Sequence, residues 1–256
     1  QNDILLNSDL FLKKKIVYNN KKNEELDKED LRLIEVTYKN FIRNGADLNH
    51  TDKEKIRKID ERLSMLSPQF SNNVLNAQNK YELWIEEEKD LAGLPDSSIN
   101  MAKEEAKQKG QSNKWLFTLQ YPSMGPFLNY AKNRELRKEL FLAYGGLCNN
   151  DEFNNNEIVK EIVQLKHKRA NLLGFDTFAD YVLEDRMAQN ITNVYGLLDD
   201  LYDNCYEKAK EELNELKEYA KKLDGIENFK QWDQSYYSTK LKKEKFNIDP
   251  EMLRPY

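Results

Sequence analysis

The chain has 256 residues, a net charge of −5, 33% charged residues and 11% aromatic residues. Disordered chains are poor in aromatic side chains, so this composition indicates a folded protein with a heavily charged surface. The short basic runs at residues 13–15 and 242–245 are offset by neighbouring acidic residues. A nucleic-acid partner is not expected, because such binding needs a basic stripe. A membrane partner is not expected either, because no apolar run approaches the length of a membrane span.

Low counts of glycine and proline, 9 and 6, favour long helices over a turn-rich β fold. Apolar residues recur every three or four positions along most of the chain, as they do in amphipathic helices. This periodicity predicts an all-α fold of roughly eight helices, at about residues 28–45, 51–74, 97–110, 126–145, 156–174, 177–188, 192–225 and 232–241. The segment 114–121 is short, aromatic and followed by Pro122, which predicts the one extended segment of the chain.

Two residues interrupt or end these helices. Pro68 lies within the second helix, where proline removes a main-chain hydrogen bond, and it predicts a kink or a short break. Gly174 stands where a left-handed C-cap residue belongs. The stretch 167–188 (HKRANLLGFDTFADYVLEDRMA) is therefore interpreted as a helix–turn–helix seam. Its packing side chains are expected to be Leu172, Leu173, Phe175, Phe178 and Tyr181.

A search for catalytic and metal-binding motifs finds none. A zinc hydrolase needs three protein ligands and an open position. The two histidines, His50 and His167, are far apart in sequence and form no H-E-x-x-H motif. Cys148 and Cys205 lack metal-ligand spacing, and Cys148 has no histidine nearby that would make it a nucleophile. Composition and spacing alone therefore predict an all-α domain and single out no catalytic residue and no metal ligand.

Several stretches of the sequence, in colinear order, resemble one enzyme family. Residues 63–110 (LSMLSPQFSNNVLNAQNKYELWIEEEKDLAGLPDSSINMAKEEAKQKG) and 114–144 (KWLFTLQYPSMGPFLNYAKNRELRKELFLAY) are similar to the N-terminal half of the thimet oligopeptidase and peptidyl-dipeptidase family of zinc metallopeptidases. Residues 172–175 (LLGF), the Met-Ala at 187–188 and residues 232–256 (WDQSYYSTKLKKEKFNIDPEMLRPY) match the same family. The likeness extends to bacterial peptidyl-dipeptidases (dipeptidyl carboxypeptidases), which remove dipeptides from the C-termini of peptides.

The resemblance implies that residues 1–256 are a single helical domain, an internal fragment that forms one half of a channel-type helical metallopeptidase. The family's H-E-x-x-H motif is not in this sequence, so the catalytic zinc domain is expected beyond residue 256. In the full-length enzyme, zinc would polarise the scissile carbonyl and activate water. The fragment alone is expected to hold no zinc and to cleave no peptide. Its expected partners are short unfolded peptides and the missing catalytic half, and the compartment stays open between cytoplasm and cell envelope.

The resemblance also implies that these helices form a wall of a substrate channel. Tyr121, Pro122, Tyr236 and Tyr237 lie in segments that combine aromatic side chains with irregular backbone, which predicts that they line the channel. The alternative is that all four are ordinary core and turn residues. A second hypothesis for the whole chain is a stand-alone helical scaffold that binds partners through its charged, tyrosine-rich surface. A fragment would also expose an apolar face that the missing half normally covers.

Overall fold

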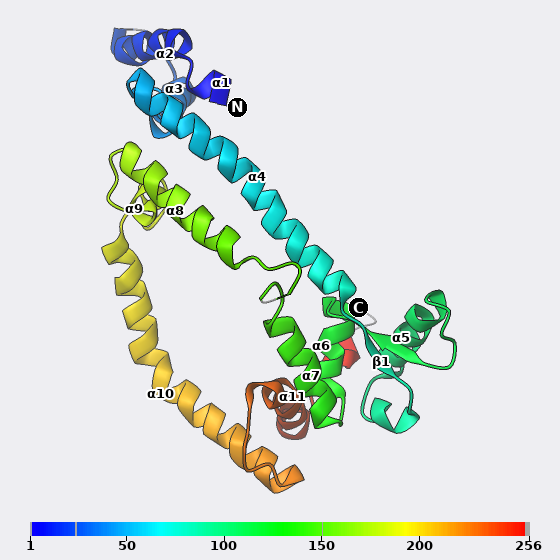
Figure 1. Cartoon of the computed structure of the whole chain (residues 1–256). Helices are drawn as coiled ribbons and strands as arrows, with labels where there is room; N and C mark the ends of the chain where they lie inside the picture. Colours follow the sequence, from blue (N-terminus) through cyan, green and yellow to red (C-terminus); the bar gives the residue numbers. More distant parts are fainter. Residues whose placement is uncertain (1, 24, 150, 254–256) are drawn as a thin grey trace. The chain divides into compact units, whose positions relative to one another are not determined.

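The computed structural model describes residues 2–23, 25–149 and 151–253 (Figure 1). These residues form eleven α-helices and one sheet of two short strands, so the predicted all-α fold is confirmed. The helices exceed the expected eight for two reasons. Helices α1 (Asn2–Leu5) and α2 (Ser8–Asn20) precede the first predicted helix, and the segment predicted as one helix over 126–145 forms two. In the part of the chain that the structure describes, no helix is both long and apolar enough to cross a membrane.

The chain divides into two compact units. Unit 1 consists of Gln1–Phe70 and Asn156–Leu197, and unit 2 consists of Ser71–Asn155 and Leu198–Tyr256. The chain therefore passes between the units three times, and two of these crossings fall inside the long helices α4 (His50–Lys80) and α10 (Ile191–Asp224). The expectation of a single helical domain over residues 1–256 stays a prediction.

Unit 1 has a small apolar core where α2 packs on α3 (Lys28–Arg43). Its buried side chains are Leu5, Phe11, Phe41 and Ala46. The ring of Phe11 stacks on the rings of Tyr38 and Phe41, with centroids 5.8 and 6.4 Å apart. Such aromatic pairs stabilise a core beyond the area that they bury.

The stretch 167–188 forms the predicted helix–turn–helix seam of unit 1. Helix α8 (Asn156–Leu172) ends just before Gly174, whose φ of +86° is the left-handed conformation that glycine adopts most readily. Helix α9 (Phe178–Leu183) follows, capped by the side chain of Thr177. The ring of Tyr181 packs edge-on against Phe175 at 5.4 Å. Arg169 Nε of α8 also donates a hydrogen bond to Asp60 Oδ1 of α4 at 2.7 Å, which joins the two helices.

Helix α4 is continuous from His50 to Lys80 and contains Pro68 (Figure 1), so the predicted short break is wrong. Pro68 lies on the exposed side of the helix. Water can therefore hydrogen-bond the main-chain carbonyl that has lost its N–H partner, which lowers the cost of the proline.

Unit 2 is built around a small antiparallel sheet of two strands. The predicted extended segment 114–121 contains strand β2 (Trp115–Phe117), and its antiparallel partner β1 (Leu83–Ile85) was not predicted. Leu83 pairs with Phe117, and α5 (Asp96–Gln108) packs against β2. The buried cluster around this sheet comprises Leu83, Ile85, Leu91, Leu94, Ala102, Phe117, Leu119, Met124, Phe127, Ala131 and Leu140.

The segment predicted as one helix from Pro126 forms α6 (Tyr121–Tyr130) and α7 (Arg134–Gly145). Ala131 ends α6 with an extended backbone (φ −60°, ψ 126°). The side chain of Asn133 then begins α7 by accepting hydrogen bonds from the main-chain N–H groups of the first turn. Pro126 thus lies inside α6 and does not open a helix.

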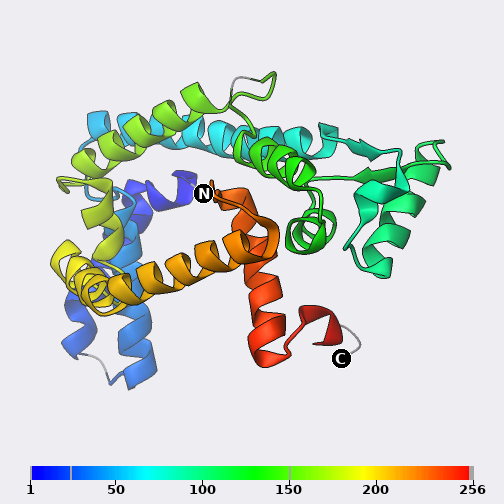
Figure 2. The ribbon, with the colours of Figure 1, turned by 90° about the horizontal axis from the view of Figure 1, so that it is seen from below.

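Two further helices complete unit 2. Helix α10 ends at Asp224, and a loop turns the chain into α11 (Gln231–Phe246) (Figure 2). Helix α11 packs against α6 and α7. Its face toward α10 forms a second buried cluster of Leu216, Ala220, Tyr236 and Tyr237. Short 3₁₀ helices occur at Lys21–Asn23, Glu88–Leu91 and Pro250–Leu253.

Candidate functional site

Two of the four predicted channel residues, Tyr121 and Pro122, begin α6 on the surface of unit 2. Pro122 suits the first turn of a helix, because its missing N–H would have no partner there. Tyr121 is 77% exposed. Its ring lies along the helix, 3.5 Å from where a β-carbon at position 125 would be, a position that is occupied by Gly125. This aromatic ring is therefore available for contact with a ligand.

Pro122 also lines a hollow of about 460 Å³ in unit 2. The walls come from the end of α4, from α5 and from the segment between β2 and α6. The polar lining side chains include the amides Gln78, Asn79 and Gln120 and the hydroxyls Thr118 and Ser123. Gln120 Nε2 donates a hydrogen bond to Asn79 Oδ1 at 3.0 Å. Amide side chains both donate and accept hydrogen bonds, so this wall matches the alternating donors and acceptors of a peptide main chain.

One ion pair stands at the rim of the hollow. Lys109 Nζ donates a hydrogen bond to Glu82 Oε1 at 2.7 Å, and the indole Nε1 of Trp84 donates to Glu82 Oε2 at 3.0 Å. The hydrogen bond from Lys109 holds the pKa of the Glu82 carboxyl below its usual value, and the same contact raises the pKa of Lys109. Both groups therefore stay charged near neutral pH. The pair is suited to binding and not to proton transfer.

The other two predicted residues, Tyr236 and Tyr237, are 4% and 2% exposed and lie in the core of unit 2. The hydroxyl of Tyr237 donates a hydrogen bond to Asp224 Oδ2 at 3.0 Å. Burial and this hydrogen bond raise the pKa of Tyr237 well above its usual value. The structure thus places the four predicted residues in two settings: Tyr121 and Pro122 at the surface, and Tyr236 and Tyr237 in the core.

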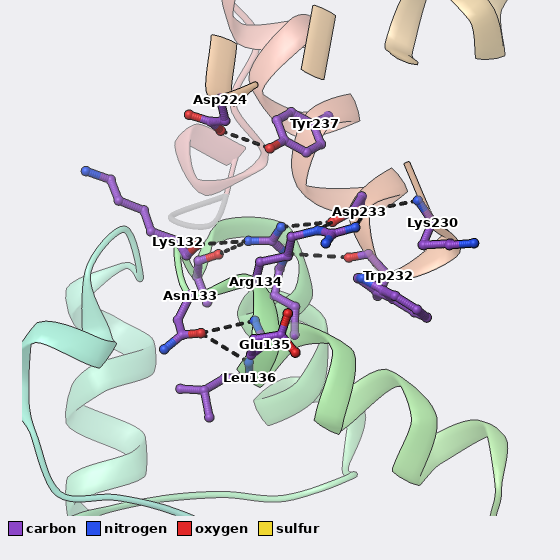
Figure 3. A network of polar contacts seen from close by, with 12 residues as sticks. Lys132, Asn133, Arg134, Glu135, Leu136, Asp224, Lys230, Trp232, Asp233 and Tyr237 are labelled. Carbon is purple, nitrogen blue, oxygen red and sulfur yellow. Dashed lines mark hydrogen bonds and ion pairs between the residues drawn. The ribbon is translucent and has the colours of Figure 1, made fainter. Parts of the chain in front are cut away.

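A buried ion network next to these tyrosines joins α7 to α11 (Figure 3). The carboxylate of Asp233, which is fully buried, accepts hydrogen bonds from Arg134 Nε at 2.9 Å and Nη2 at 2.7 Å. It also accepts from Arg137 Nη2 at 3.2 Å and from the main-chain N–H of Lys230 at 3.0 Å. Burial works against the charged carboxylate, but these donors outweigh it and hold the pKa of Asp233 below its usual value.

Arg137 is the most buried cation of this network, at 1% exposed. Its Nη1 donates to the main-chain oxygens of Ala131 at 2.7 Å and Lys132 at 3.1 Å. Its guanidinium carbon lies 4.0 Å from the ring centroid of Tyr236, a cation–π contact. The network therefore fixes where α11 begins relative to α6 and α7, and with it the position of both buried tyrosines.

Sequence reasoning does not single out Arg134, Arg137 and Asp233. Two arginines three positions apart share one face of a helix, and an aspartate three residues into a helix often caps it. Both signals are weak in a chain in which 33% of the residues are charged. Which of the many ion pairs would be buried depends on how the helices pack.

Within the described residues, no group of three histidine, cysteine, aspartate or glutamate side chains lies close enough together to hold a metal ion. His50 begins α4 and His167 lies in α8. Cys148 is buried, and burial raises the pKa of its thiol, which disfavours the reactive thiolate. The side chains that the structure describes therefore do not fit a catalytic zinc ion.

Comparison with known proteins shows similarity to one group of enzymes. A family model described as Peptidase family M3 matches residues 127–256, just over half of the chain. Oligopeptidase A of Haemophilus influenzae is 37% identical over 230 residues, which cover 88% of this chain and 34% of that protein.

Two further relatives match nearly the whole chain. Dipeptidyl carboxypeptidase of Escherichia coli is 30% identical over 256 residues, 100% of this chain and 38% of that protein. Saccharolysin of Saccharomyces cerevisiae is 33% identical over 264 residues, 99% of this chain and 36% of that protein. The chain thus spans about a third of the length of each of these curated relatives.

Proposed function

The chain belongs to peptidase family M3, and on that premise we propose that it is a non-catalytic, helical part of a zinc metallopeptidase that hydrolyses short peptides. The resemblance found in the sequence is thereby confirmed. We further propose that the complete enzyme removes dipeptides from the C-termini of its substrates. The observation that carries the proposal is similarity along nearly the entire chain to proteins about three times as long, among them a dipeptidyl carboxypeptidase.

Zinc would be held by residues outside 1–256. The sequence has no H-E-x-x-H motif, and the described residues bring no three possible ligands together. When bound elsewhere in the enzyme, zinc would act as the Lewis acid that activates water. No step of hydrolysis is assigned to a side chain of this chain, and residues 1–256 alone are expected to be inactive.

The part that this chain would play is binding of the peptide. Support comes from the hollow beside Pro122, whose amide side chains suit a peptide main chain, and from the exposed ring of Tyr121, the residue that precedes Pro122. Tyr236 and Tyr237 are buried, so in this proposal they act by holding α11 in place and not by touching substrate. The expected substrates are short, unfolded peptides.

The first test is the intact mass of the native polypeptide, captured from its source by antibody and measured by mass spectrometry. A mass well above 30.3 kDa, zinc in the purified protein and cleavage of peptides would support the proposal. A native mass near 30.3 kDa would contradict it and favour the stand-alone scaffold. Tight zinc binding and robust hydrolysis by residues 1–256 alone would contradict the inactivity of the fragment.

A second test concerns the peptide-binding role of Tyr121. In the full-length enzyme, Tyr121→Ala should lower kcat/KM on peptides with apolar side chains by roughly 2-fold to 10-fold, the range expected for one aromatic contact. Tyr144→Ala is the matched control, because Tyr144 is an exposed tyrosine on another helix of the same unit, α7. Equal kcat/KM for the Tyr121 variant and the control on several peptides would remove Tyr121 from the substrate site.

A further inference from the structure

One face of α10 is apolar along most of its length, but only its C-terminal part is covered. Leu216 and Ala220 are buried against Tyr236 and Tyr237 of α11. Toward the N-terminal end of the helix, five more side chains lie on the same side by helical periodicity: Leu198, Leu201, Tyr202, Cys205 and Leu213. This set is called the α10 face below.

Within unit 2 the α10 face is open to solvent. Its leucines and its tyrosine are between 39% and 58% exposed, and Cys205 is exposed as well. Single exposed apolar side chains are common, but a contiguous row of them marks an interaction surface. The row from residue 198 to 213 extends over about 22 Å of helix at 1.5 Å per residue, which is the length of contact that a partner helix makes.

The α10 face also leads into a groove between α10 and α11. This hollow of about 580 Å³ is lined in part by Leu213, Leu216, Leu241 and Phe246. Phe246, at the end of α11, is 65% exposed. The groove continues the contact by which Leu216 and Ala220 already pack on α11. The covered and the open parts are thus one surface, which is the form that receives an amphipathic helix.

We propose that the α10 face is a docking surface for the part of the same peptidase that lies outside residues 1–256. This inference rests on the proposed function and deepens it, because it names the surface by which this chain would hold the catalytic part. Its support is twofold: the α10 face is continuous with a packed core contact, and the chain accounts for about a third of the length of its relatives. A catalytic part of that size would have apolar surface of its own to bury, and the α10 face would be the surface on which it packs.

The chain contains a native probe of this surface. Cys205 lies in the α10 face and is exposed, whereas the other cysteine, Cys148, is buried and serves as an internal control. The experiment measures the rate of alkylation by iodoacetamide at each cysteine, by peptide mass spectrometry, in the 256-residue chain and in the full-length peptidase. Cys205 should react at least about tenfold more slowly in the full-length protein, and Cys148 should react slowly in both.

A variant pair tests the same surface without relying on the thiol. Leu201→Gln should lower the Tm of the full-length peptidase and speed the alkylation of Cys205 in it. The same substitution should leave the Tm of the 256-residue chain unchanged, because Leu201 is 49% exposed there. Glu207→Gln is the matched control, because residue 207 lies on the opposite side of α10 by helical periodicity. Glu207→Gln should change neither the Tm nor the rate of Cys205 alkylation in either protein.

Several outcomes would overturn the inference. Equal reactivity of Cys205 in both proteins, or a Leu201→Gln variant that behaves like Glu207→Gln, would show that the rest of the peptidase leaves the α10 face open. Protection of Cys205 in the 256-residue chain that grows with protein concentration would assign the surface to a second copy, and protection at every concentration would assign it to residues 1–256 themselves. An active full-length peptidase with reactive Cys205 would refute only this inference, whereas a native mass near 30.3 kDa would refute the proposed function.

Discussion

Removing the carboxylate of Asp233 should destabilise unit 2 more than any single exposed ion pair could. In Asp233→Asn the side chain keeps its shape, but Arg134 and Arg137 lose their charged partner. Arg137 is 1% exposed, so water cannot replace the lost carboxylate. Breaking a buried ion pair by removing one partner costs about 3–5 kcal/mol, which is a large part of the 5–15 kcal/mol that stabilises a typical protein.

The sign of the pH dependence follows from the lowered pKa of Asp233. An aspartate has a pKa of about 3.9 in an unfolded chain, and a lower value in the folded protein means that folding favours the ionised form. Its contribution to the free energy of unfolding is therefore fully present above the unfolded pKa and is lost as the pH falls toward the folded pKa. The stability difference between wild type and Asp233→Asn should shrink below about pH 4.

Urea unfolding followed by tryptophan fluorescence measures the stability of unit 2. The three tryptophans of the chain, Trp84, Trp115 and Trp232, all lie in unit 2. The control is Glu86→Gln, which removes an exposed ion pair of the same unit, Lys114–Glu86 at 2.5 Å, and should cost at most about 1 kcal/mol. A loss for Asp233→Asn no larger than that of the control at pH 7 would refute the argument that burial makes this network important.

Three more substitutions test individual features of the fold. Pro68→Ala should raise the Tm in a circular-dichroism melt, because it restores a main-chain hydrogen bond inside α4 at a gain of about 1–2 kcal/mol after the entropy of proline is offset; a lower Tm would show that Pro68 serves the fold. Tyr237→Phe should cost about 1–2 kcal/mol in urea unfolding through loss of the hydrogen bond to Asp224, and an unchanged midpoint would contradict this. Gly93→Ala should cost more than about 2 kcal/mol, because its β-carbon would lie 2.4 Å from a main-chain oxygen at a φ of +93°. Gly110→Ala, with φ +79° and nothing within 4 Å, should cost only about 1 kcal/mol, and equal losses for the two glycine variants would contradict the role of the close approach.

Helical periodicity predicts most of the fold because each long helix buries one stripe against its neighbours. It fails where the decisive contact is distant in sequence. Strand β1 is only three residues long (Leu83–Ile85) and exists because it pairs with β2, thirty residues later in the chain. The split between α6 and α7 depends on Ala131 and on the cap at Asn133, neither of which disturbs the apolar stripe. At Pro68 exposure to water lowers the cost of the missing hydrogen bond, which the periodicity does not show.

The candidate site is less predictable than the fold. Tyr121 and Pro122 can be selected from sequence because their segment combines aromatic side chains with irregular backbone. Both begin α6 at the surface, and Pro122 lines the hollow of unit 2. Tyr236 has the same local appearance, but the structure buries it under Arg137. Whether a tyrosine in a helix faces core or solvent depends on the helix packed against it. That information lies in α7, about a hundred residues earlier in the chain.

The division of the chain also affects the order in which the protein can be made. Residues 71–155 separate the two pieces of unit 1, and residues 156–197 separate the two pieces of unit 2. At a translation rate of about 5–20 residues per second, roughly 5–20 seconds pass between the synthesis of Asp60 in α4 and of Arg169 in α8, which bind each other in the folded protein. During that interval α4 has been synthesised but α8, the helix that it contacts, has not. A chain released before residue 197 lacks part of both units, so early termination leaves a product in which neither unit is complete.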